Sequence, residues 1–119
     1  MKIALAQLNY TVGDVEGNTN KIIESVRRAK AEGADLVVFA EQAISGALSF
    51  DLLRKNPFLE QCEDALMRIA AECDTVDAIV GLPILTKEGT ISAAALIQKE
   101  ESSAMWENRI LPCAANWGF

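Results

Sequence analysis

The sequence predicts an α/β fold, with a mixed sheet that carries its helices on one face. Apolar runs of strand length at residues 3–8, 36–39 and 78–83 alternate with two helical patterns, which indicates βαβ units and parallel strands. After residue 83 the connections shorten to a few residues, and connections this short allow only antiparallel neighbours. The chain has 119 residues, of which 50% are apolar. We therefore treat residues 1–119 as one domain, large enough to bury a core.

The first strand is expected from Ile3 to Leu8, where nearly every residue is apolar, as in a strand buried on both faces. A polar turn follows. Asn18 is expected to cap the first helix, because its side-chain oxygen can accept a hydrogen bond from a free backbone N–H. Apolar residues then recur at helical spacing, and Gly33 stands where a left-handed residue would end the helix.

The second strand is expected at Leu36–Phe39, parallel to the first because a helix connects them. Residues 40–56 show no sustained period and are expected to form a loop, with one helical turn at 51–55. Pro57 suits the first turn of a second helix. That helix has an apolar stripe made of Phe58, Cys62, Ala65, Ile69 and Cys73, widened by Leu59, Leu66 and Ala70.

The third strand is expected at Ala78–Pro83, with the proline at its end or at a sheet edge. Strands at Ile91–Gln98 and Ala104–Arg109 should continue it as an antiparallel meander. Two right-handed crossovers of one set place both helices on the same face of the sheet. The opposite face is then apolar without a cover from this chain, so another copy or a further segment should cover it.

Charge and composition exclude several classes of protein. The net charge of −6 argues against a nucleic-acid partner, and the Lys and Arg residues form no cluster for anionic lipid. The N-terminus turns polar too early for a signal peptide, and no apolar run is long enough to span a membrane. The absence of histidine excludes Ser-His-Asp and Cys-His catalysis and most zinc sites. We expect a cytoplasmic protein and assign no metal and no cofactor.

Glu41 is the best candidate for a functional residue. It follows the second strand, and ligands in open α/β sheets bind beyond the carboxyl ends of the strands. Partial desolvation there would raise its pKa toward the range of a general base. The competing interpretation is a solvated glutamate that starts a loop.

The cysteines are weaker candidates. Cys62 and Cys73 fall on the apolar stripe of the second helix, where small apolar packing explains them. Cys113 follows Leu111-Pro112, but the sequence supplies no neighbouring base that would activate its thiol. Three cysteines without close pairing suit a reducing compartment.

Several segments, in order, resemble the opening of the glutaminase domains of glutamine-dependent NAD synthetases, which belong to the nitrilase superfamily. These segments are Met1–Asn9, Val12–Asp14, Gly17-Asn18, Gly33–Phe39 with Glu41, Val80–Pro83, Ala93–Leu96 and Leu111-Pro112. The resemblance implies a four-layer αββα sandwich, of which this chain supplies one sheet and its helices. It therefore predicts a homodimer that pairs through the uncovered sheet face.

The resemblance also implies a glutamate base, a lysine and a cysteine nucleophile that attacks the carboxamide of glutamine. The glutamate carries over to Glu41. The position of the lysine holds Asn108, a neutral amide that cannot stabilise an oxyanion by charge. The nucleophilic cysteine of the family lies beyond Phe119, and Cys113 is not its counterpart. Ala40, Gly46-Ala47-Leu48 and Ser92 also depart from the family pattern, at positions where it usually has proline, Gly-Tyr-Pro and asparagine.

Three interpretations follow. The first is a fragment or degenerate relative of the ammonia-releasing domain, inactive by itself, which would take glutamine or another small amide only if activity remains. The second is a non-catalytic nitrilase-fold subunit with a binding or regulatory role. The third is another amide hydrolase of the superfamily, truncated in the same way. An unrelated flavodoxin-like module is disfavoured, because the C-terminal meander does not belong to that strand order.

Overall fold

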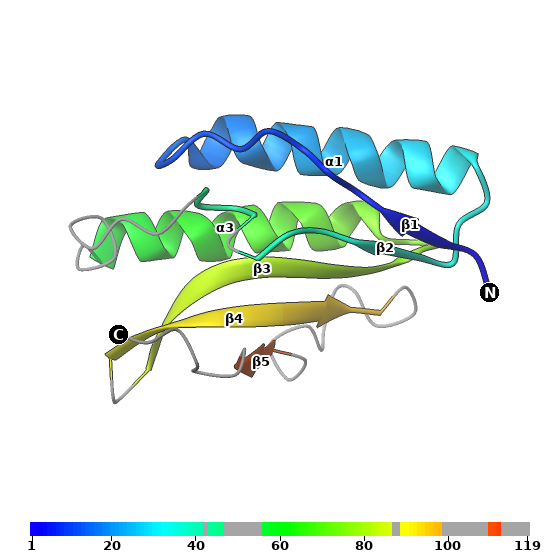
Figure 1. Ribbon diagram of the computed structural model, residues 1–119. Coiled ribbons are helices and arrows are strands. Elements are labelled where there is room, and N and C mark those ends of the chain that lie inside the picture. Colours follow the sequence, from blue (N-terminus) through cyan, green and yellow to red (C-terminus); the bar gives the residue numbers. More distant parts are fainter. Residues whose placement is uncertain (42, 47–55, 87–88, 99–109, 113–119) are drawn as a thin grey trace.

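The computed structural model describes residues 1–41, 43–46, 56–86, 89–98 and 110–112. In chain order its elements are β1 (Ile3–Leu5), α1 (Val15–Ala31), β2 (Leu36–Val38), α3 (Asn56–Glu72), β3 (Asp77–Thr86), β4 (Gly89–Ile97) and β5 (Ile110–Pro112) (Figure 1). The described strands form one sheet in the order β1-β2-β3-β4-β5. β1, β2 and β3 are parallel, whereas β4 and β5 run antiparallel to their neighbours, so the predicted mixed sheet is confirmed.

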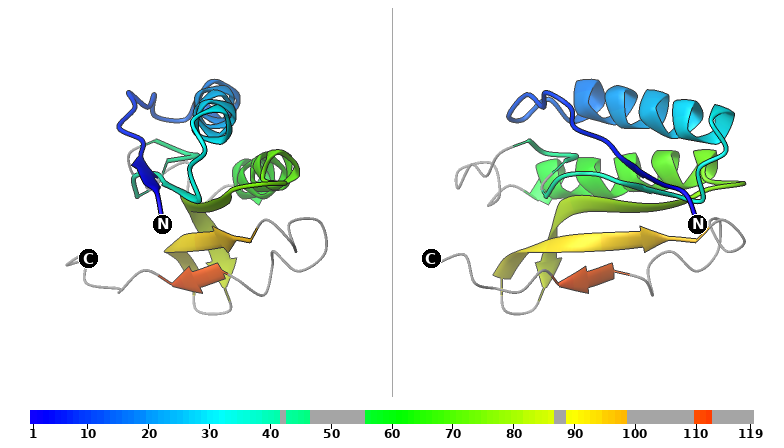
Figure 2. Two further views of the ribbon diagram at one scale, coloured as in Figure 1. Left: turned by 90° about the vertical axis from the view of Figure 1, so that its right-hand side faces the viewer. Right: turned by 45° about the vertical axis from the view of Figure 1, so that its right-hand side comes forward.

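Both long helices lie on the same face of the sheet, as the crossover rule predicts (Figure 2). One row of side chains across the strands points toward them and consists of Ala4, Val37, Ala78 and Ile97. The last three are at most 1% exposed. The helices contribute several of the large, fully buried side chains of this core, among them Ile22, Val26, Leu66 and Ile69.

The next row of side chains lies on the opposite face, which we call the open face. It consists of Leu5, Val38, Ile79 and Leu96, which stand opposite one another in the sheet register. Leu5 is 73% exposed, and the other three are partly exposed. The expectation that the first strand is buried on both faces is therefore wrong for this chain, because its odd-numbered side chains point away from the helices.

The first helix begins with a different cap from the one expected. Asp14 is the N-cap, and its Oδ1 accepts a hydrogen bond from the Gly17 backbone N–H at 3.0 Å. Asn18 lies inside α1 and is fully buried, so its side chain has another role. The predicted end of the helix is confirmed, since Gly33 follows it with φ of 75°.

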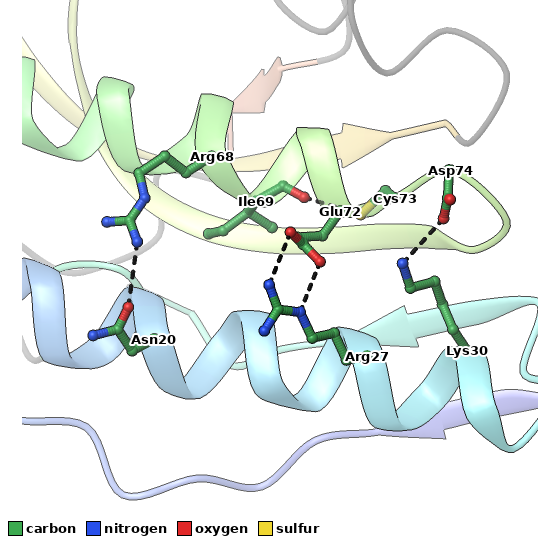
Figure 3. A network of polar contacts seen from close by, with 8 residues as sticks. All are labelled: Asn20, Arg27, Lys30, Arg68, Ile69, Glu72, Cys73 and Asp74. Carbon is green, nitrogen blue, oxygen red and sulfur yellow. Dashed lines mark hydrogen bonds and ion pairs between the residues drawn. The ribbon is translucent and has the colours of Figure 1, made fainter.

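The second helix begins at Asn56, one residue before the predicted Pro57. Every residue of its predicted apolar stripe is buried. Two polar contacts join the two helices, Arg27 with Glu72 at 2.9 Å and Arg68 with Asn20 at 3.3 Å (Figure 3). A third, Lys30 with Asp74 at 3.1 Å, joins α1 to the turn after α3. The hydrogen bond from Arg27 lowers the pKa of Glu72, and the one from Lys30 lowers the pKa of Asp74.

The third strand continues beyond the point where the sequence predicted its end. Pro83 lies within β3, which extends to Thr86. The odd-numbered residues of β3 bond toward β2, as Asp77 N–H does to Asp35 O and as Ile79 O does from Phe39 N–H. The nitrogen of Pro83 therefore points to the side where β2 has already ended at Val38, and its missing N–H removes no bond from the sheet.

Two further predictions are not tested by the described part of the structure. The expected strand at 104–109 and the helical turn at 51–55 lie outside the described residues. In the described part of the chain, neither helix is long and apolar enough to cross a membrane.

Candidate functional site

Glu41 lies in a turn just beyond the end of β2. β3 fixes the chain on both sides of this turn, because Phe39 N–H donates to Ile79 O at 3.0 Å and Ile44 N–H donates to Gly81 O at 3.2 Å. The two acceptors are two positions apart on β3, whereas the two donors are five positions apart along the chain. The excess chain must project from the sheet, and it presents Glu41 beyond the carboxyl ends of the parallel strands, where α/β proteins bind ligands.

The side chain of Glu41 is exposed. The desolvation that we expected from its place at an apolar strand end is therefore absent in this chain. A glutamate that acts as a general base works best where water is excluded. Any such exclusion would have to come from residues that cover this end of the sheet.

A buried asparagine connects the turn of Glu41 to the first helix. The Asn18 side-chain amide donates to Ile44 O at 3.1 Å and to Thr11 O at 2.8 Å, and its oxygen accepts from Thr11 N–H at 2.8 Å. A backbone bond from Gly13 N–H to Ser45 O, at 2.9 Å, runs beside it. Together these bonds join the loop after β1 to the loop that carries Glu41.

Sequence reasoning missed this role for Asn18, although a signal was present. Asn18 stands four residues before Ile22 and eight before Val26, on the stripe that α1 buries. A polar residue on a buried stripe needs hydrogen-bond partners, since an unpaired buried amide is costly. The expected capping role correctly gave the Asn18 side chain hydrogen bonds to backbone groups. It was misplaced because α1 begins at Val15, three residues earlier.

Gly46 allows the two loops to approach closely. It has φ of 80°, a conformation that residues with a side chain rarely adopt. A Cβ at this position would lie 2.8 Å from the backbone oxygen of Thr11 and 2.8 Å from the Cα of Val12. The glycine is therefore required by both its backbone conformation and its surroundings.

Tyr10 is a further neighbour of the site that the sequence did not single out. It packs against the core, and its hydroxyl is buried without a hydrogen bond of good geometry to the described residues. Burial raises the pKa of the phenol, and the nearby Ala40 backbone offsets only part of that rise. Tyr10 thus places a polar atom beside the backbone that precedes Glu41.

The cysteines behave as predicted where the structure describes them. Cys62 and Cys73 are fully buried, and burial raises the pKa of each thiol to about 12. Thiols of this kind are unreactive near neutral pH. Asn108 and Cys113 lie outside the described residues. Among the residues that are described, no group of His, Cys, Asp and Glu could hold a metal ion.

Sequence comparison identifies relatives of this chain. The carbon-nitrogen hydrolase family profile matches residues 2–111. The glutamine-dependent NAD(+) synthetase of Xanthomonas campestris pv. campestris (strain 8004) is 41% identical over 113 residues, which cover 94% of this chain and 20% of that protein. The corresponding enzyme of Aquifex aeolicus (strain VF5) is 36% identical over 114 residues, with the same coverage. The chain therefore spans about a fifth of the length of these curated relatives.

Solved structures agree with the sequence matches. A glutamine-dependent NAD(+) synthetase from Cytophaga hutchinsonii superposes with a TM-score of 0.77 at 26% identity, over 82% of this chain and 17% of that one. An amidase from Nesterenkonia sp. gives a TM-score of 0.72 at 24% identity, over 83% of this chain and 38% of the amidase. The second match shows the shared fold alone. An active-site cysteine is described for that amidase.

Proposed function

Because this chain belongs to the carbon-nitrogen hydrolase family, we propose that it supplies the N-terminal, glutamate-bearing portion of a domain that hydrolyses glutamine and releases ammonia. The relatives that match most of the chain are glutamine-dependent NAD(+) synthetases, and the chain aligns with their N-terminal part. The observation that carries the proposal is the projecting turn of Glu41, fixed to β3 on both sides.

In this proposal Glu41 acts as the base for a cysteine that the rest of the domain provides. The carboxylate takes the thiol proton, and the thiolate attacks the carboxamide carbon of glutamine. Glu41 then gives this proton to the amide nitrogen, so that collapse of the tetrahedral intermediate expels ammonia and leaves a thioester. Water hydrolyses the thioester to glutamate and restores the thiol. The described cysteines do not fit the nucleophile, because Cys62 and Cys73 are buried against the sheet.

We propose that the chain is inactive by itself. The exposure of Glu41 supports this, since the base lacks a closed, water-excluding site. Asn108 supports it as well, because an amide supplies no positive charge for the oxyanion. Because Asn108 replaces the expected lysine, a second candidate function stays open. It is a non-catalytic nitrilase-fold subunit that binds or regulates a partner.

The test uses the portion of the Xanthomonas campestris enzyme that follows the region aligned with this chain, up to the end of its amidase-like part. We call this piece the complement. Chain and complement, expressed together, should release ammonia from glutamine, and neither piece should do so alone. Glu41→Gln should lower the rate by about 10²-fold or more, the range for loss of a general base. Glu24→Gln, an exposed glutamate on α1, is the matched control and should leave the rate unchanged.

Asn108→Lys separates the two candidates. In the catalytic proposal the restored cation should raise the rate by about 10²-fold, because one oxyanion-stabilising group is worth that much. Ammonia release by the chain alone would contradict the claim of inactivity. An assembly that forms but stays inactive even with Asn108→Lys would favour the non-catalytic subunit.

Without a complement, we propose that two copies pair through the open face and so form a homodimer. The apolar row of Leu5, Val38, Ile79 and Leu96 supports this, because exposed apolar patches mark interaction surfaces. The free, buried thiols of Cys62 and Cys73 support a location in the reducing cytoplasm.

A further inference from the structure

The hydrogen-bond ladder between β1 and β2 stops just before Glu41. The two strands are parallel, and beyond β1 the ladder continues with a bond from Ala6 N–H to Val38 O at 2.9 Å. In a parallel ladder the next bond would run from Ala40 N–H back to Ala6 O. Among the described residues, no backbone oxygen accepts from Ala40 N–H. The residue that precedes Glu41 therefore lacks the support that the ladder gives to β2.

Ala40 N–H points toward the chain that follows β1. Phe39 N–H donates to Ile79 O on β3, at 3.0 Å. Successive N–H groups of an extended chain point to opposite sides, so Ala40 N–H is directed away from β3 and toward the side of β1. Ala40 is exposed in this chain, where water can accept from its N–H. Once further residues cover this end of the sheet, the N–H needs an acceptor from the protein.

Tyr10 places such an acceptor on the side of β1. Its hydroxyl is buried and has no hydrogen bond of good geometry to the described residues. Burial raises the pKa of the phenol, and the Ala40 backbone opposes that rise. A group that lowers the pKa of an acid stabilises its negative form, so the N–H of Ala40 faces the phenol oxygen. One donor and one acceptor, both without a well-formed bond, thus lie together beside the base.

The Tyr10 hydroxyl is held in place by packing. Its ring packs against the hydrophobic core, which fixes the direction of the hydroxyl without a polar partner. Buried polar side chains almost always have at least one partner. Hydrogen bonds of catalytic sites are often long or poorly aligned in the free protein and tighten only when the site is assembled. The poor alignment of the Tyr10 hydroxyl with Ala40 N–H fits a site that is still open.

We propose that Tyr10 is a positioning residue for Glu41: in the assembled domain its hydroxyl oxygen accepts a hydrogen bond from Ala40 N–H and so fixes the residue that precedes the base. This rests on the proposed function. Phe39 anchors this side of the turn to β3, and the Tyr10 bond holds the next residue from the opposite side. Such support matters because a displacement of about 1 Å can lower the rate of a positioned catalytic group by about 10²-fold.

Tyr10→Phe removes the hydroxyl and keeps the ring, so it separates stability from rate. In the chain alone the free energy of unfolding should stay the same or rise, because a buried hydroxyl without a well-formed bond does not stabilise the fold. Urea denaturation measures this, with Asn18→Ala as the contrast, since the Asn18 amide makes three good bonds. An equal loss of stability in both variants would overturn the inference, because the hydroxyl would then be a bonded part of the fold.

In the complex with the complement, Tyr10→Phe should lower kcat for ammonia release by about three- to tenfold, the effect of one hydrogen bond. KM for glutamine should stay the same, because the hydroxyl acts on the base and not on the substrate. Size-exclusion chromatography should show the same amount of complex. Thr75→Val removes an exposed hydroxyl before β3 begins, at the opposite end of the sheet, and is the matched control. It should change neither kcat nor KM.

Amide hydrogen exchange of Ala40 tests the bond itself, with only this chain isotopically labelled. In the chain alone Ala40 N–H should exchange fast, because Ala40 is exposed. In the complex its exchange should slow by about tenfold or more, and Tyr10→Phe should remove most of this protection. The amide of Phe39 is already bonded to β3 and is the internal reference, which the variant should leave unchanged.

A complex that releases ammonia with the same kcat and the same Ala40 protection in Tyr10→Phe would overturn this inference and leave the proposed function standing. A rise in KM at unchanged kcat would overturn it as well, because Tyr10 would then contact the substrate. Failure of the two pieces to assemble would overturn both proposals. Ala40 protection that depends on Tyr10, in a complex without ammonia release, would support the hydrogen bond and count against the proposed function.

Discussion

The two faces of this sheet have similar apolar composition and different surroundings. The row of Ala4, Val37, Ala78 and Ile97 lies beneath the helices, whereas the adjacent row of Leu5, Val38, Ile79 and Leu96 lies on the open face. A sheet with one solvated face normally alternates apolar and polar residues. Apolar and polar residues do not alternate along these strands, so the strands have the composition of a sheet that is covered on both faces.

The sharpest test of this difference uses neighbouring residues of β4. Ile97→Ala should lower the free energy of unfolding by about 2–5 kcal/mol, because Ile97 is fully buried and the change leaves a cavity. Leu96→Ala, on the open face, should cost the monomeric chain less than about 1 kcal/mol. Urea denaturation of the two variants, at a concentration where the chain is monomeric, measures both. Equal losses would mean that the open face is already covered within the chain.

Substitution at the two loops that Asn18 joins, the one after β1 and the one that carries Glu41, should have the next largest effect on the free energy of unfolding. Asn18→Ala leaves Thr11 N–H, Thr11 O and Ile44 O without their partner, so the variant should lose about 1–3 kcal/mol of stability. Asn20→Ala, which on the same helix removes the exposed bond from Arg68, is the control. Thermal unfolding compares them, and an equal, small effect of both changes would show that the buried bonds do not stabilise the loops.

Alkaline pH should lower the stability of the core between the helices and the sheet, where Cys62 and Cys73 are buried. The pKa of Cys62 and Cys73 rises from 9.0 to about 12 on folding, so the unfolded chain loses these protons first. Stability should be complete below pH 9 and fall between pH 9 and about 12, by up to about 1.4 kcal/mol per pH unit for each thiol. Denaturation at pH 8, 9 and 10 measures the slope. Cys62→Ala with Cys73→Ala should reduce it, and an unchanged slope would assign the effect to other groups.

The smallest effect is expected on the outer surface of the helix layer. Arg27→Ala removes the bond to Glu72, but Arg27 is 65% exposed, and exposed ion pairs contribute little. The shift in melting temperature should be the smallest of the series and should shrink further in high salt. A loss comparable to that of Ile97→Ala would mean that this contact, rather than the buried row, holds the helices together.

Most of the framework could be predicted because it depends on local pattern. The apolar runs, the helical stripes of α1 and α3 and the turn at Gly33 each follow from a few neighbouring residues. Pro83 was harder to place, because its position within β3 depends on where β2 ends. Asn18 was misplaced for a similar reason, since its partners Thr11 and Ile44 come from loops distant in the sequence.

The site was predictable in position and less so in environment. The place of Glu41 after the second strand follows from the sequence, whereas its exposure depends on what covers that end of the sheet. Tyr10 escaped prediction because its place beside Ala40 depends on where the ladder between β1 and β2 ends. A tyrosine after an apolar run is not unusual by itself.

Sedimentation equilibrium of the isolated chain tests most directly the claim that the open face is an interface. We expect a species of twice the 12.9 kDa of one chain, and we expect Ile79→Glu on the open face to return it to the monomer. Glu24→Gln, on the outer side of α1, should leave the dimer intact. A monodisperse 12.9 kDa species at every concentration would contradict the claim that two copies cover this face.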